Sequence, residues 1–218
     1  LKTINLLNLD YKRFKMNVKA IFDKLKREFG KMGWWPVISK NHRFEISVGA
    51  ILTQNTSWRN VEKAIFNLDK FNFLNKEAIK QINEGELGEL IKSSGYYKQK
   101  AKKLKKFVEF LYSGKEITRE NLLEVWGIGK ETADSILLYA YNKENFVIDA
   151  YTKRVMERLG FKFKDYDELQ RIFIENLPKD YKLYNEFHAL LVKLGKEYCK
   201  KKPKCDKCCL RKDCKFNL

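Results

Sequence analysis

The sequence predicts an all-α protein, and three observations lead to this fold class. Apolar residues recur at spacings of three and four along most of the chain, which is the period of an amphipathic helix. The strict apolar–polar alternation of a half-buried strand is absent. Helix breakers stand between the periodic stretches, at Gly33 and Pro36, at Gly95, and at Ser113 and Gly114. We therefore expect helices joined by turns and no parallel sheet.

The expected helices follow one another along the chain. Their apolar stripes most economically face a core, so we assign them no chemistry. The stretches are VKAIFDKLKREF (18–29), FEISVGAIL (44–52), VEKAIFNL (61–68), LGELIKSS (87–94), AKKLKKFVEFLY (101–112), ADSILLYAY (133–141) and FHALLVKLG (187–195).

Composition indicates a globular protein with a polyanionic partner. Hydrophobic residues make up 44% of the chain, and no apolar run approaches the ~20 residues of a membrane span. Lys and Arg number 45 against 28 Asp and Glu, a formal charge of +17, which favours nucleic acid. Thermal adaptation also enriches Lys, but there Glu rises with it. A signal peptide's apolar core is lacking, so we expect a cytoplasmic, nucleoid-associated protein without a membrane partner.

All five cysteines lie in the last stretch of the chain. Cys199, Cys205, Cys208 and Cys214 have the spacing C-x5-C-x2-C-x5-C, and Cys209 is left over. Disulfides are improbable in a cytoplasmic protein, so metal ligation is the favoured interpretation. Four thiolates suit either zinc or a [4Fe–4S] cluster, and the spacing alone does not decide between them. Cys209 is also an alternative ligand to Cys208.

Residues 118–140 predict two helices joined by a hairpin. Thr118 can cap the first helix, and Gly127 and Gly129 allow a tight turn before the second. The N–H groups of such a turn and of the following helix N-terminus can bind a phosphate without reading sequence. A tight turn between helices needs glycine in any case, so this pattern is weak evidence of phosphate binding by itself.

Asp149 follows three apolar residues in FVIDAYTKRV and begins a new helical pattern. A helix N-cap is the common role for aspartate at such a position. The functional alternative is a carboxylate that points into a cleft and is partly desolvated by its apolar neighbours.

Together, LLEVWGIGKETADSILLYA (122–140), FVIDAYTKRV (146–155) and the cysteine set resemble the helix-hairpin-helix DNA glycosylase superfamily, in its endonuclease III-like branch with an iron–sulfur cluster. The resemblance runs from about Phe44 to Cys214 and includes AILTQNT (50–56), SSGYYKQKAKKL (93–104) and FHALLVKLGKEYC (187–199). WWP, LTQNT and GIGKETADSILLYA are most similar to the third type of 3-methyladenine glycosylases. The spacing from Cys199 to Cys205 is one residue shorter than the family's usual spacing.

This resemblance implies a two-lobed helical fold with a DNA cleft between the lobes. We expect a helical barrel lobe over 40–145, with the helix-hairpin-helix at 118–140. The other lobe would combine N-terminal helices within 1–39 with C-terminal helices and a cluster loop at 199–214, within 146–218.

The resemblance also implies the chemistry. Asp149 would stabilise the sugar cation and activate water. Bifunctional members carry a Schiff-base lysine directly before the Thr-Ala of the second hairpin helix, where this chain has Glu131, and a carboxylate cannot form a Schiff base. Lys130 would lie roughly 100° around the helix, facing the DNA backbone together with Gly127 and Gly129.

Other matched positions imply residues that handle the flipped base. Gln54 and Tyr96 would insert into the duplex as wedges, although a helix-end hydrogen bond and a packed surface aromatic are equally natural roles. Trp35 and Trp58 would be the two aromatic faces that hold a cationic base. The remaining expected members of the base pocket are Pro36 at its edge, Trp34 behind it and Glu131 facing the base; core filling is the alternative role for the tryptophans.

We thus expect a monomeric, monofunctional DNA glycosylase that acts on double-stranded DNA with a damaged base, an alkylated purine in the first instance. Uracil or mismatched thymine is the alternative substrate, because Gln54, Asn55 and tyrosines could donate hydrogen bonds to a neutral pyrimidine. A different class of function is a non-catalytic DNA-binding iron–sulfur or zinc module. Asp149 argues against that class, because a pure binding module needs no carboxylate facing DNA.

Overall fold

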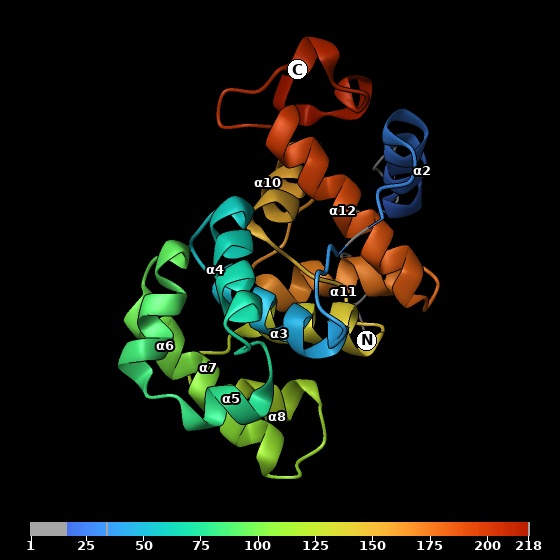
Figure 1. The fold of residues 1–218 in the computed structure, drawn as a ribbon. Coiled ribbons are helices and arrows are strands. Elements are labelled where there is room, and N and C mark those ends of the chain that lie inside the picture. Colours follow the sequence, from blue (N-terminus) through green and yellow to red (C-terminus); the bar gives the residue numbers. More distant parts are fainter. Residues whose placement is uncertain (1–16, 34, 218) are drawn as a thin grey trace. The chain divides into compact units, whose positions relative to one another are not determined.

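The computed structural model describes residues 17–33 and 35–217, and the regular elements in these ranges are all helical. The predicted all-α fold class is confirmed. The chain divides into two compact units, of which one is Trp35–Asn145 and the other joins the preceding residues to Phe146–Leu218. Figure 1 shows the elements of both units coloured along the sequence. Among the described residues, no helix is long and apolar enough to cross a membrane.

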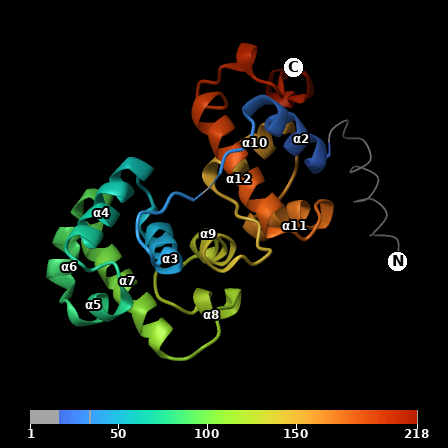
Figure 2. The same cartoon turned by 45° about the vertical axis from the view of Figure 1, so that its right-hand side comes forward.

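The unit Trp35–Asn145 is built around α3. Every residue of this helix from Phe44 to Leu52 is buried, and α3 packs against α4, α7 and α9, the last of which lies beside it in Figure 2. The elements of the unit are α3 (His42–Leu52), α4 (Trp58–Lys70), α5 (Lys76–Gln81), α6 (Glu84–Leu90), η1 (Lys92–Ser94), α7 (Tyr97–Tyr112), α8 (Arg119–Leu123), α9 (Lys130–Ser135) and the π-helix η2 (Ile136–Ala140).

A buried carboxylate fixes the segment that leads into α3. Glu45 is 1% exposed, and its two oxygens accept hydrogen bonds from the backbone N–H groups of Ile38 (2.8 Å) and Ser39 (2.7 Å). These bonds satisfy a charge that would otherwise be costly to bury. They also hold the segment that carries Trp35 and Pro36 against the start of the helix.

The other unit has an aromatic core. Phe146 stacks on Phe173 with ring centroids 3.9 Å apart, and Phe187 meets Phe146, Phe173 and Phe22 edge to face. α2 packs along α12 in this way (Figure 1). The elements are α2 (Val18–Phe29), α10 (Ala150–Leu159), α11 (Tyr166–Asn176), α12 (Tyr181–Glu197), η3 (Cys205–Lys207), η4 (Arg211–Asp213) and η5 (Lys215–Asn217).

Candidate functional site

The helix-hairpin-helix is formed by α8, a tight turn and α9. The N–H of Ile128 donates to the carbonyl of Val125 at 3.0 Å, and both side chains are buried. The turn is therefore fixed by a backbone hydrogen bond and by two side chains packed in the core. Gly127 has φ +86°, a conformation that favours glycine. Gly129 is the N-cap of α9 and is extended, and no side chain caps the helix there. The first N–H groups of α9 are therefore suited to an anion.

An internal ion pair holds the two hairpin helices together. Asp134 in α9 is fully buried and accepts from Nε of Arg119 in α8 at 2.9 Å. Nδ2 of Asn145 donates to the same carboxylate at 3.2 Å. Breaking such a pair leaves a buried charge without compensation, so the hairpin geometry is strongly specified.

Gln54 is bonded to the hairpin. Its Nε2 donates to the carbonyl of Gly127 at 3.1 Å and to Oγ1 of Thr132 at 2.9 Å, and its Oε1 accepts from Lys103. The Lys103 side chain also lies directly against Gly127, because a Cβ added there would come within 2.5 Å of it. A wedge role for Gln54 therefore requires these bonds to be exchanged when DNA binds.

Tyr96, the second expected wedge residue, is held outward by its backbone. It has φ +47°, which is uncommon for a bulky residue, and 67% of its surface is exposed. It directly precedes α7, and Lys100 in the first turns of that helix is only 1% exposed. The Lys100 ammonium group donates to the carbonyls of Leu52 (2.9 Å) and Ser94 (2.7 Å). One buried lysine thus ties together the segments that lead to Gln54 and to Tyr96.

Burial lowers the pKa of Lys100 from 10.5 to about 8, with a smaller contribution from Lys103. The unfolded chain keeps this proton to higher pH, so the free energy of unfolding should rise between about pH 8 and pH 10 as the buried amine becomes neutral. We expect the stability of the wild type, relative to Lys100→Met, to grow across this interval in urea titrations at successive pH values. Parallel pH dependences for the two proteins would contradict the assignment.

The expected base-pocket residues lie at the edge of the core of the unit Trp35–Asn145. The Trp35 and Trp58 rings are 4.8 Å apart and perpendicular, and Trp35 also packs on Tyr139 at 5.1 Å. Gly49 leaves room for Trp35, since a Cβ there would lie 3.1 Å from the indole. This differs from the predicted pair of opposed faces. The two tryptophans contact each other, because the small residue in α3 lets Trp35 sink onto the helix.

The other expected pocket residues are at the surface. Pro36 is exposed, and Glu131 and Lys130 are exposed in the first turn of α9. Trp34 lies outside the described residues. The structure thus brings Trp35 and Trp58 together and adds the buried ring of Tyr139 to them.

Asp149 is positioned by the buried segment that precedes it. Phe146, Val147 and Ile148 are at most 4% exposed. Their backbone is anchored by Gln170, whose side chain donates to the carbonyl of Phe146 at 2.7 Å. Asp149 then caps α10, with its Oδ1 accepting from the N–H of Thr152 at 2.7 Å. The capping role of Asp149 is compatible with a chemical role, because 13% of its side chain remains exposed.

Asp149 also faces His188 of α12. Nε2 of His188 lies 3.8 Å from Oδ1 of Asp149, beyond hydrogen-bonding distance but close enough for a charge interaction. Burial alone would raise the pKa of Asp149; the interactions with His188 and Thr152 outweigh it, and the pKa lies below its usual value. The carboxylate is therefore ionised at neutral pH.

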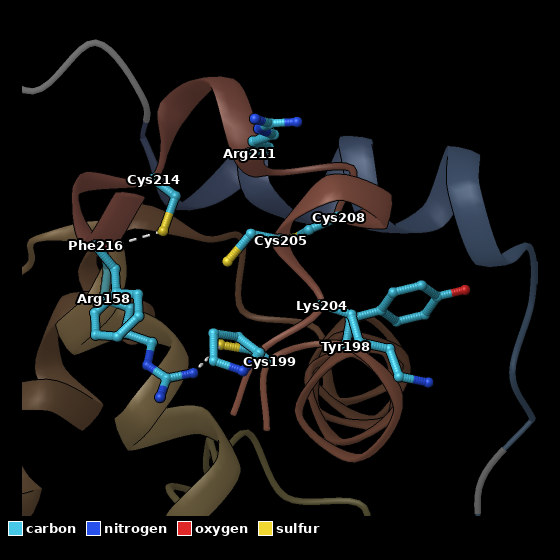
Figure 3. A pocket seen from close by; sticks show the side chains of 10 residues that line it. Arg158, Tyr198, Cys199, Lys204, Cys205, Cys208, Arg211, Cys214 and Phe216 are labelled. Carbon is cyan, nitrogen blue, oxygen red and sulfur yellow. Dashed lines mark hydrogen bonds between the residues drawn. The ribbon is translucent and has the colours of Figure 1, made fainter. Parts of the chain in front are cut away.

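Four cysteines line a single pocket near the C-terminus. They are Cys199, Cys205, Cys208 and Cys214, and the sulfur atoms of Cys205 and Cys214 point into the space between the side chains drawn in Figure 3. Cys209 does not line this pocket. Cys205 opens η3, whose cap is Cys208, and Cys214 caps η4. The four cysteines of the spacing C-x5-C-x2-C-x5-C thus line one pocket, and the fifth does not.

The donor chemistry of this pocket fits a thiolate-bound metal group. Burial raises the pKa of Cys208 and Cys214, and the neighbouring cysteines of the set raise them further, so bound cationic metal would favour deprotonation. Arg158 donates to Sγ of Cys199 at 3.3 Å, and its carbonyl accepts from Sγ of Cys214 at 3.3 Å. As the side chains stand in the described part of the chain, no group of three or more His, Cys, Asp or Glu is arranged so that it could hold a metal ion.

Several of these residues were not singled out by the sequence analysis. His188 had a signal, since it is one of two histidines in the chain and interrupts an apolar stripe. Trp126 also had a signal, because it is a tryptophan directly before the hairpin glycine Gly127; its side chain is 49% exposed. Glu45 and Lys100 carried none, because a charged residue within an amphipathic helix usually faces solvent.

Comparison with known proteins gives the same family for more than half of the chain. A family model described as "HhH-GPD superfamily base excision DNA repair protein" matches residues 48–179. The protein MJ1434 of Methanocaldococcus jannaschii, whose name assigns it provisionally to the DNA repair glycosylases, is 46% identical over 217 residues, which cover 93% of this chain and 97% of that protein.

Solved structures agree with this match. The 3-methyladenine DNA glycosylase MagIII of H. pylori, bound to 1,N6-ethenoadenine, is 32% identical with a TM-score of 0.76, covering 84% of this chain and 98% of that one. An endonuclease III trapped as a covalent intermediate with DNA has a TM-score of 0.81 over 92% of this chain and 95% of that one. Its sequence is 23% identical, so this likeness concerns the fold alone.

Proposed function

This chain belongs to the HhH-GPD superfamily of base excision DNA repair proteins and is a DNA glycosylase, and we propose that it is monofunctional and releases alkylated purines. The observation that carries the monofunctional assignment is the start of the second hairpin helix, Lys130-Glu131-Thr132. An amine is required to attack the sugar C1′ as a Schiff-base nucleophile, and Glu131 offers a carboxylate instead. Water is then the nucleophile, and the product is an abasic site.

In the proposed mechanism Asp149 acts mainly through its charge. As the bond between C1′ and the purine breaks, its electron pair goes to the base and positive charge grows on the sugar. The ionised carboxylate stabilises this cation, and water adds to C1′ and loses a proton to solvent. Because the pKa of Asp149 is lowered, this carboxylate is a weak base, which favours electrostatic stabilisation over proton abstraction as its main contribution.

Support for an alkylated purine comes from the aromatic cluster and from a similar protein. Trp35, Trp58 and Tyr139 form a contiguous group of rings, and electron-rich rings favour a cationic base, which is also a good leaving group. The H. pylori enzyme with its bound ethenoadenine is similar over most of both chains. Uracil or mismatched thymine is the alternative that the experiment below separates.

We further propose that the partner is double-stranded DNA bound by a monomer, and that Cys199, Cys205, Cys208 and Cys214 hold a [4Fe–4S] cluster. The four cysteines line one pocket, and four thiolates are the ligand number of such a cluster. The cluster would supply a covalent staple for the C-terminal segment. Arg158 would orient the Cys199 thiolate through its hydrogen bond.

A panel of duplexes that each carry one damaged base tests this function. We expect base release from alkylated purines, strand breakage only after alkali, and no protein–DNA adduct trapped by borohydride. Strong trapping would overturn the monofunctional assignment. If trapping occurs, a Lys103→Met variant should be compared, because burial lowers the pKa of Lys103 beside the hairpin and a lysine with a lowered pKa is a capable nucleophile. Release of uracil or thymine alone would overturn the alkylpurine assignment.

A further inference from the structure

Trp126 is an exposed aromatic side chain on a rigid turn. Val125 and Ile128 are only 8% and 5% exposed. The backbone hydrogen bond from the N–H of Ile128 to the carbonyl of Val125 closes the turn. Gly127 follows Trp126 directly and takes a conformation that favours glycine. With its backbone fixed, Trp126 is held out with 49% of its surface in solvent, three residues before Gly129, the N-cap of α9.

Lys102 of α7 completes this surface feature. Its ammonium nitrogen lies 4.7 Å from the centroid of the Trp126 ring, in a cation–π arrangement. Among residues 17–33 and 35–217, no carboxylate forms an ion pair with Lys102. Lys103, the next residue, lies against Gly127. The face around Trp126 is thus apolar and cationic at once, without an acidic side chain that neutralises Lys102.

A second lysine–aromatic pair in the same unit has a different environment. Lys80 lies 4.1 Å from the ring centroid of Tyr112, and Tyr112 is also partly exposed. There, however, the Tyr112 hydroxyl donates to Glu77 at 3.2 Å, so a carboxylate is part of the group. The group around Tyr112 thus contains its own carboxylate, whereas the positive charge of Lys102 at the hairpin remains available to an anion.

We propose that Trp126 and Lys102 form a second contact to the DNA backbone, in which the indole packs on a deoxyribose and the ammonium group pairs with the adjacent phosphate. In a duplex the base faces are covered by stacking, so the sugar is the apolar surface that lies beside a backbone phosphate. Hydrogen bonds to phosphate and sugar position a protein without reading sequence. This inference rests on the proposed function and adds a contact to its DNA surface.

The salt dependence of binding separates the two halves of the contact. Affinity for an undamaged, fluorescein-labelled duplex should fall about tenfold in Trp126→Ala, or about 1.4 kcal/mol, with an unchanged slope of log affinity against log salt. Lys102→Gln should instead reduce that slope by about 0.9, the value for one lost phosphate contact. Trp126→Phe keeps an aromatic ring and should lose less than Trp126→Ala. Circular dichroism and thermal unfolding establish that each variant is folded.

Tyr112→Ala is the matched control, since it removes the same kind of lysine–aromatic pair away from the hairpin. It should bind duplex as the wild type does. Equal affinity losses in Tyr112→Ala and Trp126→Ala, or wild-type binding by Trp126→Ala, would overturn the proposal. A much larger loss on single-stranded than on duplex DNA would also overturn it, because that result indicates base stacking.

These failures are distinguishable from a failure of the proposed function. If the wild type binds duplex with a steep salt dependence and releases damaged bases, the glycosylase assignment stands whatever Trp126 does. If the wild type releases no base from any duplex, the proposed function fails. Trp126 fluorescence gives an independent readout, since DNA should quench emission more in the wild type than in Trp126→Phe.

Discussion

Replacing Asp149 by Asn should reduce base excision by about 10²-fold or more while DNA binding is nearly unchanged. The substitution removes the negative charge that faces the developing sugar cation. It keeps the cap of α10, because asparagine accepts the N–H of Thr152 as well as aspartate does. Single-turnover release of the base, measured with saturating enzyme, reports the chemical step separately from binding.

A matched control comes from another helix cap in the same unit. Asp165 caps α11 by accepting the N–H of Glu168 at 2.9 Å and is exposed. Asp165→Asn makes the same chemical change at the same kind of position and should retain wild-type excision. Full activity in Asp149→Asn would contradict the carboxylate mechanism, and an equal loss in both variants would show that the effect is not specific to Asp149.

The pH dependence of base excision should depend on His188. His188→Gln removes an interaction that lowers the pKa of Asp149, so the acid limb of the pH–rate profile should move to higher pH. In the wild type that limb lies below the usual carboxyl pKa, since activity is lost only as pH falls through the lowered pKa.

The loss of base excision in Asp149→Asn should be smaller for cationic alkylpurines, which depart more readily unaided, than for any neutral base.

The fold was predictable because it depends on local patterns. Apolar spacing located the helix α3 and the hairpin helices, and Gly127 marked the turn between them, because these features are determined by neighbours in sequence. The capping position of Asp149 is also local, since an aspartate directly before a helical apolar pattern is a start signal for a helix. Its chemistry is not local, because His188 reaches it from a helix far along the chain.

Details of the candidate site depend on packing that sequence patterns do not encode. The edge-to-face contact of Trp35 and Trp58 arises because Gly49, on a third segment, has no side chain. The bonds of Gln54 to the hairpin need a turn more than seventy residues away to come within reach. Lys100 is buried only because two carbonyls from separate segments converge on it.

Removing one cysteine of the pocket should have the largest effect on the C-terminal segment. Protein purified without oxygen should be brown, with about four iron and four sulfide per chain, as for a [4Fe–4S] cluster held by four thiolates. Cys205→Ser should lose the colour and most of the iron. The described segment beyond α12 consists of short turns, and Leu210 is a buried hydrophobic residue within it. With so little burial, we expect the order of this segment to depend on the proposed cluster.

Cys209 supplies the control for this prediction. It is adjacent to Cys208 in sequence but does not line the pocket, and burial raises its pKa to about 11, so it stays a thiol at neutral pH. Cys209→Ser should therefore keep the colour, the iron content and the affinity for duplex DNA. Loss of iron in Cys209→Ser with retention in Cys208→Ser would reassign the ligand. A colourless wild type with one zinc per chain would contradict the cluster and would indicate a single zinc ion bound by the same thiolates.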